Sequence, residues 1–234
     1  MAVVYIRDVT ALDTVDRLAG YYPSLFPAEC GGPRRQKALH GRGLGILDGE
    51  SLDLTLRDTE RWNVMFLWRD PGELYLHSTS PVAATHPIGL VERVDPLTLD
   101  PLATTEPLPT GGHIWCGAMV VHENGDLYVV NGRYLHRLRF DLTLAAEAEL
   151  PSDGAHNTLL VGADGNLIVK DNRIGGVPCV LELVAKGRTP VGQSGGRQVM
   201  LELGGIGEDV DSDHGEVVGE GVLHCPLDRS LAGG

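Results

Sequence analysis

The stretch Asn124-Gly125-Asp126-Leu127-Tyr128-Val129 places a glycine turn directly before an apolar run that favours β-structure. The same phrase occurs twice more, as Pro71-Gly72-Glu73-Leu74-Tyr75-Leu76 and as Asp164-Gly165-Asn166-Leu167-Ile168-Val169. Each copy also follows a β-prone run, so each predicts a β-hairpin. The turn glycines lie 53 and 40 residues apart, a period typical of one β-propeller blade per repeat.

The middle repeat predicts a complete blade within residues 117–150. Its β-prone runs are residues 117–122, 127–131, 135–139 and 142–150, separated by tight turns at Asn124-Gly125 and Gly132-Arg133. The outer half recurs as well, because Arg93-Val94-Asp95-Pro96-Leu97-Thr98-Leu99 resembles Arg137-Leu138-Arg139-Phe140-Asp141-Leu142-Thr143-Leu144. The first repeat carries an insertion at residues 77–89, which predicts a surface loop and surface positions for His77 and His86.

We therefore expect an all-β fold, a β-propeller-like and incomplete array of four-stranded antiparallel blades, followed by a Gly-rich acidic C-terminal tail. The expected domains are an irregular N-terminal segment (1–54), the blade repeats (55–175) and a flexible or degenerate C-terminal region (176–234). Residues 177–184 and 198–203 are candidates for the missing strands of the third blade. A disordered acidic tail and a reading-frame accident are the alternatives, and composition favours the disordered tail.

The composition bears on partners and compartment. A formal net charge of −13 argues against a nucleic-acid or anionic-membrane partner, since both need clustered Lys and Arg. The N-terminus lacks a signal-peptide pattern and no stretch approaches a membrane span, which predicts a cytoplasmic protein. Cys30, Cys116, Cys179 and Cys225 are widely spaced, as isolated reduced thiols are. An arc of blades that does not close also predicts self-association through open blade edges.

Residues 156–171, His-Asn-Thr-Leu-Leu-Val-Gly-Ala-Asp-Gly-Asn-Leu-Ile-Val-Lys-Asp, resemble the propeller repeat of the gluconolactonase and SMP-30 family, and more loosely NHL and YVTN repeats. The resemblance covers about 110 residues. It implies that Asn157, which opens an innermost strand, is a ligand to a divalent metal over a central channel. Thr158 stands where the family has glycine, and the family's glutamate ligand has no match in this chain.

Blade geometry points to the same end of the molecule without that resemblance. The loop that enters each innermost strand lies near the axis on one face, so His113, Trp115, Cys116, His156 and Asn157 are expected to line one mouth. These side chains could bind a polar ligand or a divalent metal. The alternative is that Trp115 packs between blades while His156 and Asn157 satisfy backbone groups of the loops.

Three other motifs match chemical patterns only in part. Residues 192–196 fit the Gly-x-Ser-x-Gly nucleophile pattern, with Asp209 and His214 following, but lack the strand and helix that strain the turn. Residues 209–220 resemble a calcium-binding EF-hand loop with its glycine one residue late. Residues 41–45 form a glycine-rich loop without a strand or helix beside it.

The function predicted from the sequence is a ligand- or protein-binding module that takes a small molecule or a protein. The alternative is a metal-dependent hydrolase of the lactonase type. A hydrolase should place at least one Asp or Glu at the mouth, whereas a binding module need not.

Overall fold

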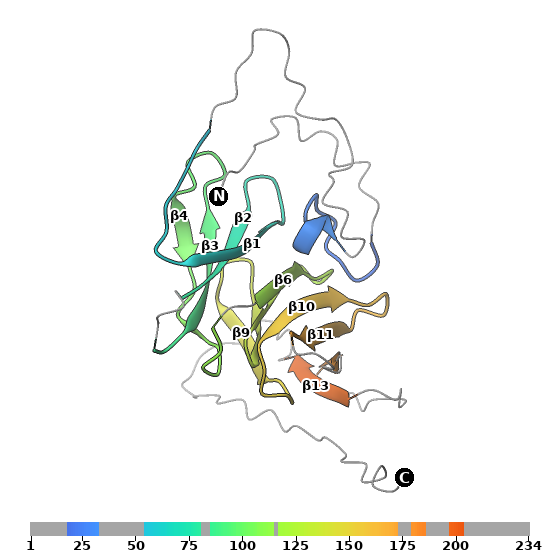
Figure 1. The fold of residues 1–234 in the computed structure, drawn as a ribbon. Coiled ribbons are helices and arrows are strands. Elements are labelled where there is room, and N and C mark those ends of the chain that lie inside the picture. Colours follow the sequence, from blue (N-terminus) through green and yellow to red (C-terminus); the bar gives the residue numbers. More distant parts are fainter. Residues whose placement is uncertain are drawn as a thin grey trace, which may run out of the picture.

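A computed structural model describes residues 18–32, 54–80, 85–114 and 117–172, together with the strands at residues 179–185 and 197–203. This part of the chain is all-β and contains three sheets that follow one another in sequence (Figure 1). Neither the motifs at residues 41–45, 192–196 and 209–220 nor most of the expected C-terminal tail falls within the described residues. The one helix among them, a single 3₁₀ turn η2 (Glu29–Gly31), lacks the length needed to cross a membrane.

The first sheet has the strand order β1-β2-β3-β4, and each strand runs antiparallel to its neighbour. Two short strands share the outer position, because β4 pairs with one end of β3 and β5 pairs with the other. Between them Thr105 keeps the pairing, since its N–H donates to Val91 O and its hydroxyl accepts from Val91 N. The strands are β1 (Trp62–Trp68), β2 (Leu74–Thr79), β3 (Ile88–Val94), β4 (Pro101–Thr104) and β5 (Leu108–Pro109).

The middle sheet confirms the four antiparallel strands predicted within residues 117–150. It has four antiparallel strands in chain order, with Asn124-Gly125 at the first hairpin tip. Gly125 has φ of +85°, a left-handed conformation that glycine adopts without steric cost. The strands are β6 (Gly117–Val121), β7 (Leu127–Asn131), β8 (Tyr134–Leu138) and β9 (Leu144–Glu149).

The third sheet is also four-stranded, so the strands proposed for residues 177–184 and 198–203 exist. Its order is β10 (His156–Val161), β11 (Leu167–Asp171), β12 (Cys179–Ala185) and β13 (Arg197–Leu203). The first three strands pair antiparallel, but β12 and β13 pair in parallel. The expectation of a uniformly antiparallel blade is therefore wrong for β13, which runs in the same direction as β12. A hairpin turn joins only antiparallel strands, whereas parallel neighbours need a longer connection that crosses back along the sheet.

The middle sheet is buried on both faces because each face packs against a neighbouring sheet. Alternate side chains of a strand point to opposite faces, so successive residues enter different clusters. Met119, Val121, Leu127 and Val129 pack against the first sheet, in a cluster with Met65, Leu67 and Tyr75. The intervening residues Ala118, Val120, Tyr128 and Val130 pack towards the third sheet, with Leu159, Val161 and Val169. This explains why β6 and β7 are continuous apolar runs rather than alternating ones.

Residues 18–32 form a segment that runs beside the first strands of the sheets (blue in Figure 1). Single β-bridges join Tyr21 to His122, Phe26 to Trp68 and Ala28 to Val120. Backbone bonds from Tyr22 N to Val121 O and from Val121 N to Pro27 O hold it on β6. The Tyr21 hydroxyl reaches the third sheet and accepts a hydrogen bond from Val161 N at 2.8 Å. The segment thus provides hydrogen-bond partners for backbone groups at the edges of all three sheets, groups that would otherwise be unpaired.

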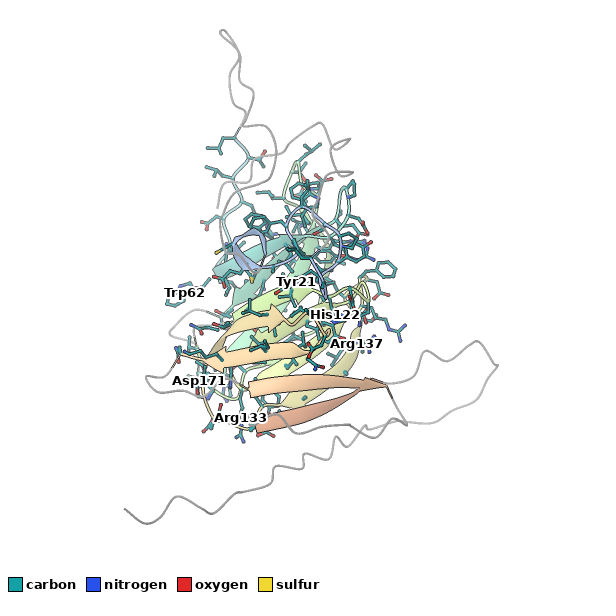
Figure 2. All side chains as sticks on the ribbon, turned by 90° about the vertical axis from the view of Figure 1, so that its right-hand side faces the viewer. Tyr21, Trp62, His122, Arg133, Arg137 and Asp171 are labelled. Atoms are coloured by element: carbon teal, nitrogen blue, oxygen red, sulfur yellow. The ribbon has the colours of Figure 1, made fainter. Side chains whose placement is uncertain are left out.

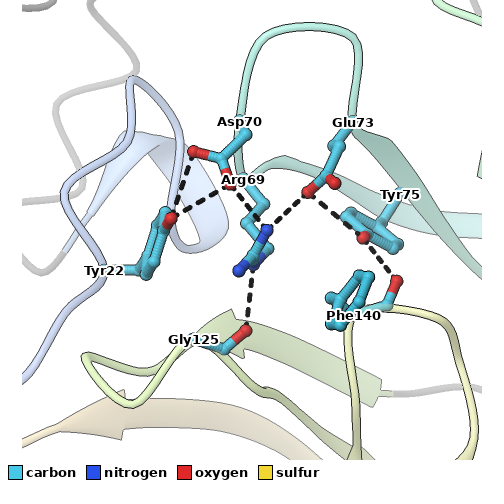
Figure 3. A network of polar contacts seen from close by, with 7 residues as sticks. All are labelled: Tyr22, Arg69, Asp70, Glu73, Tyr75, Gly125 and Phe140. Carbon is cyan, nitrogen blue, oxygen red and sulfur yellow. Dashed lines mark hydrogen bonds and ion pairs between the residues drawn. The ribbon is translucent and has the colours of Figure 1, made fainter.

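The same segment joins a polar network around Arg69 at the hairpin tips (Figure 3). The Arg69 guanidinium donates to Asp70, Glu73 and Gly125 O, at 2.6, 2.7 and 3.0 Å. It also stacks over the Tyr22 ring, while the Tyr22 hydroxyl donates to Asp70. Every charge in the network has a partner, so its role is to join the first sheet, the middle sheet and residues 18–32.

Replacing Tyr21 with phenylalanine should destabilise the fold by about 1 to 3 kcal/mol, because the buried Val161 N–H loses the hydroxyl that accepts its hydrogen bond. Urea unfolding measures the change. Tyr22→Phe is the matched control, since its hydroxyl is only part-buried and bonds to a carboxylate that also pairs with Arg69. Equal losses in the two variants would contradict the assignment of Tyr21 as the connection to the third sheet.

Candidate functional site

The two ends of the sheets carry different groups. Figure 2 shows Trp62, Arg133 and Asp171 on one side and Tyr21, His122 and Arg137 on the other. The second side is the hairpin-tip end, where residues 18–32 lie. The first side is the end at which the first strand of each sheet begins, where the sequence predicts a mouth.

At this end two connections between sheets meet the β7–β8 turn at Gly132. The first connection joins β5 to β6, and the second joins β9 to β10. Arg133 N donates to Thr110 O of the first connection, and His156 N donates to Gly132 O from the second. Gly132 has φ of +53°, and a side chain there would overlap Thr110 O and crowd the His113 Cβ. Only glycine allows the two connections to approach so closely.

We define the Gly132 cluster as His113, Gly132, Ser152, Asp153 and His156. The His113 Nε2 lies 2.9 Å from a carboxylate oxygen of Asp153, which links the two connections. Both side chains are accessible, His113 to 28% and Asp153 to 70%. Beside the cluster, Arg133 and Glu149 form a partly exposed ion pair of 2.6 Å.

His156 is buried, and both of its ring nitrogens have partners. Nδ1 lies 2.7 Å from Gly132 O and 3.1 Å from Gly154 O, and Nε2 lies 3.0 Å from the Ser152 hydroxyl oxygen. The alternative prediction, that His156 satisfies backbone groups of the loops, describes the Nδ1 side of the ring. The structure therefore places His113 and His156 together at one end of the sheets, on either side of Gly132.

The other three residues expected at the mouth, Asn157, Trp115 and Cys116, are not part of the Gly132 cluster. Asn157 is exposed at a bulge in β10, and its amide oxygen accepts only a long bond of 3.4 Å from the Thr158 hydroxyl. Trp115 and Cys116 lie outside the described residues. Within the described ranges, no group of three or more His, Cys, Asp or Glu side chains could hold a metal ion.

Two carboxylates lie at this end, as the hydrolase alternative requires. Asp153 pairs with His113, and Asp171 ends β11 opposite His156. Asp171 is buried, with 2% of its surface exposed. Repeat alignment could have found it, since Ser78, Asn131 and Asp171 each stand six residues after a hairpin glycine and are all buried polar residues.

The interior contains a pair that the sequence interpretation missed. His77 is fully buried in β2, so its expected place in a surface loop is wrong, whereas His86 is exposed as expected. β2 extends to Thr79, and the run of buried positions carries His77 into the contact between sheets. Its Nε2 donates to the Asn131 amide oxygen at 2.6 Å. We call this the His77–Asn131 pair.

Two glycines make room for the His77–Asn131 pair. Gly117 of β6 lies under the His77 ring, and Gly89 of β3 lies under the Asn131 amide. Burial lowers the pKa of His77 to about 4, aided by the nearby His136 and opposed by the hydrogen bond to Asn131. His77 is therefore neutral at pH 7, with its proton on Nε2 and a bare Nδ1.

Comparisons of the chain with protein-family models, curated proteins and solved structures found no match.

Proposed function

We propose that this chain is a propeller-like binding module that takes a small polar molecule at the Gly132 cluster. The propeller assignment is supported by three consecutive sheets that each begin with the same hairpin phrase and bury their faces against a neighbour. The gluconolactonase and SMP-30 resemblance of residues 156–171 is in keeping with this arrangement.

The observation that carries the proposal is the convergence of both intersheet connections on the turn at Gly132. Loops held by a rigid scaffold are the usual place for binding residues, because the scaffold fixes their side chains in advance. The partly exposed groups here are His113, Asp153, Arg133 and Glu149. They offer donors and acceptors of both charges, which suits a polar ligand rather than an apolar one.

A ligand screen tests this proposal. Monosaccharides, amino acids and small carboxylic acids are presented to the protein, and binding is read by ligand-detected NMR. We expect saturable binding of at least one class, weakened tenfold or more by Asp153→Ala, a loss of about 1.4 kcal/mol. The control Asp58→Ala removes an exposed carboxylate elsewhere and should leave binding unchanged. Absence of binding at millimolar ligand, or equal binding by both variants, would reject the site.

A metal-dependent hydrolase is the second candidate, because Asp153 and Asp171 supply the carboxylates that it requires at this end. Calorimetric titration with calcium, manganese and zinc chlorides separates the two functions. Saturable metal binding that is lost in Asn157→Ala would favour the hydrolase. A flat titration in the wild-type protein would remove it and leave the binding module.

A further inference from the structure

We propose that Ser152 and His156 form a nucleophile and general-base pair that transfers small acyl groups from carboxylic esters to water. The pair goes beyond ligand binding and does not depend on the binding proposal. It rests on the hydrogen bonds around one imidazole ring.

The partners of His156 fix its tautomer. Both groups near Nδ1 are backbone carbonyls, Gly132 O and Gly154 O, and a carbonyl can only accept a hydrogen bond. In the neutral imidazole Nδ1 therefore carries the ring proton, and Nε2 is the nitrogen that accepts a hydrogen bond. The Ser152 hydroxyl, 3.0 Å from Nε2, must then donate its hydrogen bond to that nitrogen.

This arrangement is what an activated serine requires: a hydroxyl bonded to a base, with the base oriented by a third group. Here the Gly132 carbonyl is the orienting group, and the ring is held from both sides. His156 is 2% exposed while Ser152 is partly exposed, so the base is buried and the serine that carries the nucleophile is partly accessible to solvent. Ser152 and His156 are four residues apart, and an irregular, bent segment rather than a helix brings them together.

The proposed reaction balances without a cofactor. The Ser152 oxygen bonds to the ester carbonyl carbon while its proton passes to His156 Nε2. The carbon–oxygen bond to the leaving alcohol then breaks, and the alcohol departs with that proton. Water attacks the acyl-serine, gives a proton to Nε2, and releases the carboxylic acid as Ser152 recovers its proton.

The test uses the full chain and p-nitrophenyl acetate as the probe. Acid-quenched protein is digested, and mass spectrometry locates the acetyl group. We expect acetyl-Ser152 in the wild type and a fall of roughly 100-fold or more in the rate of nitrophenolate release in Ser152→Ala, which removes the hydroxyl that the base activates. Thr158→Ala is the matched control, since that hydroxyl contacts only the neighbouring Asn157 amide and should leave the rate unchanged.

Two outcomes would overturn the proposal. One is acetylation confined to lysines with Ser152 unmodified in the wild type, which needs no variant to fold. The other is a Ser152→Ala protein with wild-type melting temperature and a rate within about twofold of wild type. Ser152→Cys adds a second readout, because a thiol beside His156 should react with iodoacetamide faster than an isolated thiol near neutral pH.

Discussion

Lowering the pH from about 7.5 to about 4.5 is expected to remove roughly 2 to 3 kcal/mol of folding stability through one side chain, His77. The pKa of His77 is about 4 in the folded protein, below its ordinary value of 6.5. At pH values between about 4 and 6.5, the unfolded chain binds a proton that the folded chain does not, so the free energy of unfolding decreases as the pH falls. The contribution is complete above pH 6.5 and is lost as pH falls to about 4.

Urea unfolding across this range measures the effect, and His77→Gln should abolish it while keeping a donor for Asn131. His86→Gln is the control, since His86 is exposed and should retain the wild-type pH dependence. Asp95 and Asp141 titrate below the pH range of this experiment, because hydrogen bonds from Thr98 and Thr143 hold the pKa of these carboxyl groups below the usual 3.8. A His77→Gln protein that loses as much stability as wild type would show that His77 does not resist protonation.

Gly89→Ala should destabilise the fold by about 2 to 3 kcal/mol, although its backbone would accept alanine. Gly89 has no left-handed φ, so strain is not the cause. The added methyl would lie 2.6 Å from the Asn131 amide nitrogen, in a closely packed contact between two sheets. Overpacking of this kind typically costs about 1 to 3 kcal/mol, and here it also displaces the acceptor of His77 Nε2.

A double-mutant cycle isolates the contact between Gly89 and Asn131. Asn131→Ala removes the three atoms nearest to the new methyl, which are the Asn131 amide oxygen, carbon and nitrogen. Gly89→Ala should therefore cost at least about 1 kcal/mol less in that background. Gly72→Ala is the control glycine. It has a left-handed φ of +83° but nothing within 4 Å of its added methyl, so it should show no coupling to Asn131→Ala. Additive losses for Gly89 and Asn131 would contradict the packing described for this pair.

The elements of the fold were predictable wherever local signals agreed. In the middle sheet, Asn124-Gly125 and Gly132-Arg133 mark turns between β-prone runs, and every strand formed where expected. β12 and β13 also formed, although their composition favoured disorder. β12 pairs with β11 and β13 pairs with β12, and the composition of a local window does not report such pairing. Their parallel pairing depends on the path between them, which strand patterns do not encode.

The candidate site was less predictable because its chemistry depends on contacts distant in sequence. The prediction that His113 and His156 lie at one end of the sheets came from the expected blade geometry rather than from a local motif. The bonds from His156 to Gly132 and from His77 to Asn131 span 24 and 54 residues. Ser152 carried no motif, since Pro151-Ser152-Asp153-Gly154 reads as an ordinary turn. His77 was misplaced because a Ser- and Thr-rich stretch resembles a loop, while in this fold it lies inside a strand.

The contact between residues 18–32 and the third sheet bears on how this protein is made. Tyr21 and Val161 are 140 residues apart. At a synthesis rate of about 5 to 20 residues per second, Tyr21 waits roughly 7 to 30 s on the ribosome before its partner is made. During that interval β1 and β6 are available to it first, in the order of their synthesis. A nascent chain can therefore assemble the segment sheet by sheet, and the Tyr21 hydroxyl is its last bond to form.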